Sequence, residues 1–353
     1  MSVRLVPRVE TSKAMVYGSP LLALLLTLVA GFVMFTLMGI NGGQALYAFF
    51  IVPVSDSYGV SELLVKAIPL ILIGIGLSIG FKANVWNIGA EGQLVMGAVA
   101  AGGLAIFNHE SESAWLLPAM LLAGGLGGMA WAAIPAFLKT RFNANEILTS
   151  LMLTYVAALF LSYLIHGPWR DPEGFNFPES RLFGDAALLP LLGEGTRLHI
   201  GLLIAVAVVI AAWVLLSRTL IGFQVRVVGA APRAAQFAGF NHKRLVWFGL
   251  LSGGCLAGVA GMIEVSGPIG QLVPQVSPGY GFTAIIVAFV GRLHPLGVMI
   301  AGLLLALSYL GGETLQMEMG LPQAVTGVFQ GMLLFFLLAC DVLISYRIRF
   351  GKA

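Results

Sequence analysis

The chain has 353 residues, of which 58% are hydrophobic and only 10% are charged. Soluble domains carry about 25% charged residues, so this composition excludes an ordinary soluble protein and indicates a chain that lies mostly in a lipid bilayer. The formal net charge of +3 gives no basis for a nucleic-acid partner. Both cysteines, Cys255 and Cys340, fall in apolar segments, which favours buried free thiols over a disulfide.

Apolar segments between charged residues predict an all-α, polytopic transmembrane helical bundle with about ten spans. The first apolar segment, 20–40, is too long for a signal-peptide core and matches a full span. The eighth and ninth spans are short and are separated by Arg292, His294 and Pro295, so we expect broken or re-entrant helices there. The expected helices cover residues 18–40, 62–81, 88–107, 115–138, 146–166, 198–217, 245–265, 280–291, 295–311 and 322–343.

The distribution of positive charges predicts the orientation of the spans. With the N-terminus inside, all but four of the 19 Lys and Arg residues fall on the cytoplasmic side, as the positive-inside rule requires. The same alternation places both termini in the cytoplasm. We therefore expect a cytoplasmic tail at 1–17, a transmembrane domain at 18–343 and a second cytoplasmic tail at 344–353. The four outer cations are Lys66, Arg170, Arg181 and Arg197.

The segment from Asn84 to Gln93 places polar side chains in a region that should lie within the membrane. Charged and amide groups there need partners or water, and broken helices near the membrane middle often present such groups to a substrate. We therefore take Asn84, Asn87, Glu91 and Gln93 as candidates for a substrate pathway. The alternative, which we favour for Glu91, is that these groups hydrogen-bond between helices and hold the bundle together.

Other positions indicate local structure rather than chemistry. Asn145 and Glu146 are expected to cap the fifth helix and to complement its dipole. The small-residue runs at 124–128 and 254–261 predict close helix packing. The outer loop at 167–197 is either a solvated connector or a lid or docking face. Glu264 either faces a pore or reaches the membrane interface.

The interior loop at 218–244 contains a very short helix with its own start and stop signals. Pro232 suits a first helical position, and Gly239 suits the left-handed position just past a helix end. Such a helix is too short to be stable alone. The short helix lies between long apolar spans, in the most basic interior loop, where a soluble partner could bind and move it. This predicts a transport subunit driven by a separate motor protein.

Enzyme signatures are missing from the sequence. It contains no Gly-x-x-x-x-Gly-Lys-Ser/Thr phosphate loop and no His-Glu-x-x-His metal motif, so we expect neither a cofactor, a metal nor catalysis in this chain. Intramembrane acids are few, since only Glu91 and Glu264 qualify, which argues against a self-powered secondary transporter. That transporter remains an alternative, as does an intramembrane enzyme, for which a nucleophile–base pair is lacking.

Several blocks together resemble one family, the membrane permease subunits of bacterial ABC importers in the branched-chain amino acid, simple-sugar and nucleoside group. Most similar is the longer permease of general nucleoside uptake systems. The blocks are residues 87–93, 145–153, 167–172 with Phe177-Pro178, 222–239, and 281–291 followed by 294–297.

The resemblance implies a partner set and a location. Such permeases pair with a second permease, two ATPase subunits that bind ATP and Mg, and an extracellular or periplasmic substrate-binding protein, in the bacterial inner membrane. It also implies that 232–239 is the coupling helix that contacts the ATPase. The residues that match its pattern are Arg226, Gly229, Pro232, Ala234, Ala235 and Gly239. Nucleosides are the expected solute, with a simple sugar or a branched-chain amino acid as the alternative.

Two positions depart from the family pattern. The family usually has Asn before the coupling-helix proline, where this chain has Ala231, so a capping side chain is lost. It often has Asn near the position of Thr154, which bears on the choice of solute.

Overall fold

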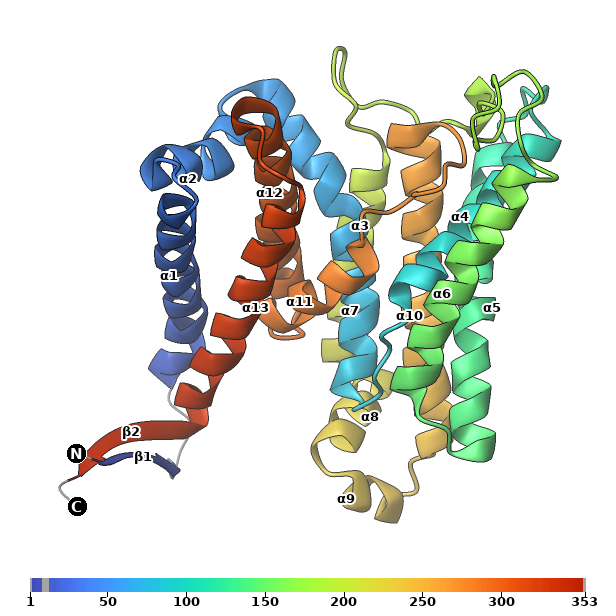
Figure 1. The fold of residues 1–353 in the computed structure, drawn as a ribbon. Helices are drawn as coiled ribbons and strands as arrows, with labels where there is room; N and C mark the ends of the chain where they lie inside the picture. Colours follow the sequence, from blue (N-terminus) through green and yellow to red (C-terminus); the bar gives the residue numbers. More distant parts are fainter. Residues whose placement is uncertain (1, 8–12, 352–353) are drawn as a thin grey trace. The chain divides into compact units, whose positions relative to one another are not determined.

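The computed structural model describes residues 2–7 and 13–351 of the chain (Figure 1). The predicted all-α bundle is confirmed, and the helices group into two compact units, Met1–Val60 with Leu307–Ala353, and Ser61–Ala306. The helices are α1 (Lys13–Leu37), α2 (Gly42–Phe50), α3 (Ser57–Lys82), α4 (Ala90–Phe107), α5 (Leu116–Phe142), α6 (Glu146–His166), α7 (Gly201–Arg218), α8 (Leu220–Ala230), α9 (Pro232–Phe237), α10 (His242–Glu264), α11 (Tyr280–Val290), α12 (Pro295–Met319) and α13 (Ala324–Ser345). Three shorter turns are η1 (Val52–Val54), η2 (Asp185–Ala187) and the π-helical η3 (Val265–Ile269).

Within the described residues, eight helices are long and apolar enough to cross a membrane, namely α1 from Gly18, α3, α4, α5, α6, α7, α10 with η3, and α12. The two other predicted spans correspond to α13, whose described apolar part is Ala324–Cys340, and to α11. With 11 residues, α11 is about 16 Å long, half of what the roughly 30 Å hydrocarbon core requires. It is therefore the helical half of a broken span, as predicted for the eighth segment. The same expectation was wrong for the ninth, because α12 is a continuous helix of 25 residues, long enough to cross.

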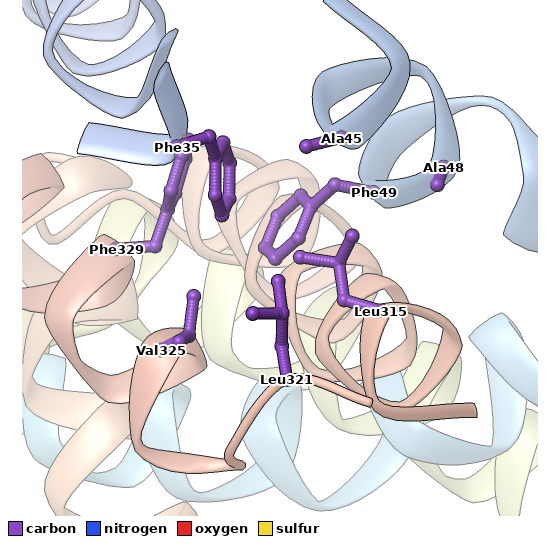
Figure 2. Close-up of a cluster of buried hydrophobic side chains, with 8 residues drawn as sticks. All are labelled: Phe35, Ala45, Ala48, Phe49, Leu315, Leu321, Val325 and Phe329. Carbon is purple, nitrogen blue, oxygen red and sulfur yellow. The ribbon is translucent and has the colours of Figure 1, made fainter. Parts of the chain in front are cut away.

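The first unit packs α1 and α2 against α13 and the C-terminal part of α12. Its core is an aromatic and aliphatic cluster in which the rings of Phe49 and Phe329 lie 4.7 Å apart (Figure 2). Asn41 begins α2 by accepting hydrogen bonds from the backbone of Gly43 and Gln44. The members of the cluster are Phe35, Ala45, Ala48, Phe49, Leu315, Leu321, Val325 and Phe329.

The two ends of the chain pair with each other. Strand β1 (Ser2–Pro7) runs antiparallel to β2 (Tyr346–Gly351), with Ser2 opposite Gly351 and Pro7 opposite Tyr346. The sequence did not predict this ribbon, because each strand finds its partner more than 300 residues away. A paired ribbon places both tails on one side of the membrane, which agrees with an even number of crossings; Arg8, one of the N-terminal cations used for orientation, lies outside the described residues.

The second unit is centred on α4, α5 and α10, whose backbones approach closely at glycines, as the two small-residue runs predicted. A Cβ built on Gly258 would overlap the carbonyl oxygen of Gly124, and one built on Gly254 would lie 2.5 Å from that of Gly128. A Cβ on Gly97 would likewise overlap the backbone of Gly258. Because these contacts leave no room for a side chain, the three helices form a rigid frame for the segments described next.

Candidate functional site

The starts of α4 and α11, each preceded by a non-helical segment, meet inside the second unit. After α3 ends at Lys82, residues 83–89, here called the linking segment, run without helix to the start of α4. Likewise, residues 270–279 run without helix from the end of η3 to the start of α11. The N-terminal ends of α4 and α11 are in direct contact, because a Cβ built on Gly281 would overlap the backbone nitrogen of Glu91. The site is therefore formed by two helix starts rather than by helix faces.

Glu91 joins these two helix starts. Its Oε2 accepts a hydrogen bond of 2.6 Å from the backbone N–H of Gly281, and the Ser277 hydroxyl also donates to the carboxylate. Ser277 in turn accepts from the backbone of Gly279 and Tyr280, which caps α11. A carboxylate at the positive end of a helix dipole is stabilised there. The buried Glu91 thus makes the contact between helices that the anchoring interpretation requires.

The side-chain amides of Asn87 and Gln93 hydrogen-bond to each other. The amide of Asn87 donates to Gln93 Oε1 over 2.8 Å, and Gln93 Nε2 donates back to Asn87 Oδ1 over 3.0 Å. Asn87 Oδ1 also accepts from the backbone of Gly89, and both side chains are at most 2% exposed. In this conformation the pair closes the linking segment onto α4, so these two amides do not line an open path.

Asn84, the fourth pathway candidate, lies apart from the other three. It is exposed, takes a left-handed conformation with φ 58°, and accepts a hydrogen bond from the indole of Trp86. The indole lies 5.9 Å from the ring of Phe289 near the end of α11 and 5.1 Å from that of Phe81. Trp86 of the linking segment thus contacts the end of α11, while Glu91, at the start of α4, contacts its beginning.

Helix α6 supports the linking segment from a third side. Ser150 Oγ accepts from the backbone N–H of Ile88, and a Cβ on Gly89 would lie 2.5 Å from the Ser150 carbonyl oxygen. Thr154, where the family often has Asn, is buried with its Cα 2.7 Å from a Cβ built on Gly92. Asn145 caps α6 through hydrogen bonds to Ile147 and Leu148, as predicted.

At the other end of the linking segment lies a helical arm, α8 followed by α9. Pro232 occupies the first turn of α9, and Gly239 takes φ +79°, so the predicted start and stop are confirmed. Ala231 makes no side-chain cap, which agrees with the loss expected at this position. Ala235 is buried, and its carbonyl accepts from the N–H of Phe240.

Two features of the arm were not apparent from the sequence. Phe237, the last residue of α9, is 94% exposed, although it is a large aromatic side chain. Gly229 lies directly on the end of α3, because a Cβ built there would overlap the Lys82 carbonyl oxygen and lie 2.9 Å from its carbon. Arg226, one turn earlier in α8, is close enough to Lys82 for the two positive charges to interact.

The outer side carries charged groups that are largely paired. Arg197 binds the buried carboxylate of Glu62 through two nitrogens, one of them 2.9 Å from Glu62 Oε1. Nearby, burial lowers the pKa of His199 to about 4, and its Nδ1 accepts from the backbone of Gly201. Glu264 is buried in α10 and interacts with the charges of Lys66 and Arg197. It thus faces the protein interior rather than the interface.

The outer loop at 167–197 is docked over part of its length. The backbones of Ser180, Phe183 and Leu189 donate to the carbonyls of residues 272, 270 and 266, respectively. Its first part borders an open pocket of about 340 Å³ that is lined by Phe107, His109, Trp169, Arg170 and Arg181, among others. Among the described residues, no group of three or more His, Cys, Asp or Glu side chains could hold a metal ion.

Comparison with known proteins identifies the family of this chain. A family model described as branched-chain amino acid transport system / permease component matches residues 59–338. The chain belongs to this permease family. The glucose ABC transporter permease protein of Haloferax volcanii is 38% identical over 99% of this chain and 94% of its own length.

Two further relatives match nearly the whole permease. The guanosine ABC transporter permease protein of Bacillus subtilis is 29% identical over 94% of both chains. The nucleoside ABC transporter permease protein of Lactococcus lactis is 25% identical over 98% of this chain and 95% of its own. The protein is thus a multi-pass ABC transporter permease for a small solute, a transport subunit rather than an enzyme, which works with ATPase and substrate-binding partners.

Proposed function

We propose that the permease forms half of the translocation path of an importer for nucleosides in the bacterial inner membrane. The other half would come from a second permease, with two ATPase subunits on the cytoplasmic side and a substrate-binding protein outside. The guanosine and nucleoside permeases among its relatives support this solute. A simple sugar is the second candidate, because the relative at 38% identity is a glucose permease.

The observation that carries the proposal is the exposed arm. A six-residue helix cannot persist on its own, yet α9 is ordered by Pro232, by Gly239 and by hydrogen bonds to α8 through Ala231. We assign the arm as the ATPase contact, with Arg226, Gly229, Pro232, Ala234, Ala235 and Gly239 in it. Phe237 is the proposed anchor, since an exposed aromatic side chain at an interface centre carries a large share of binding energy. ATP and Mg would be bound by the partner alone.

The solute path is proposed to open where the starts of α4 and α11 meet. In the present conformation Asn87, Glu91 and Gln93 are occupied by protein partners. Separating the start of α4 from the start of α11 would free these amide and carboxylate groups, which are of the kind that binds the hydroxyls and ring nitrogens of a nucleoside. Asn84 would lie at the cytoplasmic exit.

The test uses the whole transporter, purified with its partner subunits and reconstituted in proteoliposomes with ATP on the ATPase side. Labelled guanosine, adenosine, glucose and leucine are offered in parallel. The proposal predicts ATP-dependent accumulation of the nucleosides. Accumulation of glucose alone would select the second candidate. Uptake that persists without ATP and collapses with a proton uncoupler would refute the proposal in favour of a secondary transporter.

A further inference from the structure

Residues 81–91, which comprise the end of α3, the linking segment and the start of α4, contact α11 at several points. Trp86 stacks on Phe289 near the end of α11, and Glu91 hydrogen-bonds Gly281 at its beginning. The ring of Phe81, in the last turn of α3, is stacked on Phe289 at 5.4 Å. Aromatic pairs of this kind are held together beyond the effect of their buried area. Moving the end of α3 therefore displaces α11 as well.

The end of α3 is itself a tight, hydrogen-bonded turn. The backbone nitrogens of Ala83 and Val85 both donate to the carbonyl of Gly80, and Asn84 takes the left-handed conformation between them. Val85 is buried, with its Cβ 3.7 Å from a Cβ built on Gly249 of α10. The turn is therefore fixed by backbone hydrogen bonds on one side and by packing against α10 on the other.

The arm contacts this turn at Gly229. Gly229 lies against the backbone of Lys82 and is 3.6 Å, measured from a built Cβ, from the Cα of Ala83. The arm is also internally connected, because Ala231 donates to Val227 of α8 while its carbonyl accepts from Ala235 of α9. The ring of Phe240, just beyond α9, packs edge-on against Phe223 of α8 at 6.2 Å. A force on α9 thus reaches Gly229 through a hydrogen-bonded unit.

We propose that Gly229 is the positioning residue that transmits motion of the arm to the body made of residues 81–91 and α11, so that driving α9 separates or closes the Glu91–Gly281 contact. This inference rests on the proposed function, because it takes the arm to be the part that a motor moves. Glycine is required at position 229 because it has no side chain. The backbone of the arm can therefore lie directly against the backbone at the end of α3, with no flexible side chain between them.

The test measures solute transported per ATP hydrolysed in the reconstituted transporter, at equal amounts of assembled complex. Gly229→Ala inserts a methyl group between the arm and Lys82. We expect ATP hydrolysis to continue while transport per ATP falls about tenfold, within the range known for residues along coupling routes. Gly331→Ala is the matched control, since a Cβ there meets no atom within 4 Å, and it should leave the ratio unchanged.

A second pair of variants covers the case in which Gly229→Ala does not assemble. Trp86→Ala removes the stack on Phe289 and should lower the same ratio, whereas Trp86→Phe keeps a ring there and should restore it. A wild-type ratio in assembled Gly229→Ala, or in Trp86→Ala, overturns the inference. A wild-type complex that accumulates no solute on ATP would instead refute the proposed function, so the two failures are distinguishable.

Discussion

Replacing Glu91 should weaken the contact between the starts of α4 and α11 by an amount that the structure bounds. Glu91→Ala leaves the Gly281 N–H without its acceptor at 2.6 Å, in a place where the carboxylate is only 9% exposed. Loss of a hydrogen bond to a charged group costs about 1.5–3 kcal/mol. We expect about 2 kcal/mol, because the Ser277 hydroxyl can rotate toward another acceptor. Glu91→Gln keeps an acceptor oxygen without the charge and should cost about half as much.

The assay is thermal unfolding of the purified permease in detergent. At about 2–4 °C per kcal/mol for a domain of this size, Glu91→Ala should lower the melting temperature by about 4–8 °C and Glu91→Gln by about half that. Glu110→Gln is the control, because that side chain is 89% exposed and its contact with His109 is 3.7 Å long. If Glu91→Ala has the same melting temperature as this control, the carboxylate does not join the two helices.

Three further predictions concern packing, pH and the arm. Gly258→Ala forces a methyl group against the Gly124 carbonyl and should cost about 1–3 kcal/mol in thermal unfolding, whereas Gly327→Ala, where nothing lies within 4 Å, should not destabilise. Burial lowers the pKa of His199 to about 4, so folding favours the neutral ring. The neutral ring's contribution to the free energy of unfolding is therefore complete above pH 6.5. About 3 kcal/mol of it is lost as the pH falls toward 4. His199→Asn should flatten the melting temperature over that interval, and an unchanged slope would exclude this histidine as the cause. Ala235→Asp, which places a carboxylate at a buried position of the arm, or Gly239→Val, which forces a branched side chain into φ +79°, should abolish ATP-driven uptake while membrane insertion measured by immunoblot persists; normal uptake in either variant would contradict the role of the arm.

The parts of the fold that depend on nearby residues could be predicted from the sequence. Pro232 and Gly239 predicted the two ends of α9 because their backbone preferences act within one helical turn. Asn145 predicted the start of α6 for the same reason. The glycine runs in α5 and α10 predicted close packing, because small residues allow backbones to approach closely whichever helix is the neighbour.

The parts that depend on distant partners could not be predicted. Glu91 and Gly281 are 190 residues apart, and Arg197 and Glu62 are 135 apart, so no local pattern relates them. The sequence suggested that the amides of Asn87 and Gln93 were available for a solute, whereas the non-helical path of the linking segment turns them toward each other. The contact of Gly229 with Lys82 likewise depends on α8 lying against the end of α3, which the hydrophobic periodicity of the sequence does not predict.

We propose that this polypeptide does no work of its own and is driven through the arm at 220–239. The most direct measurement compares concentrative uptake of labelled guanosine by vesicles that contain the permease alone with uptake by vesicles that contain the complete transporter and ATP. We expect accumulation above the external concentration only in the second case. Accumulation against a gradient by the permease alone, driven by an ion gradient, would contradict it.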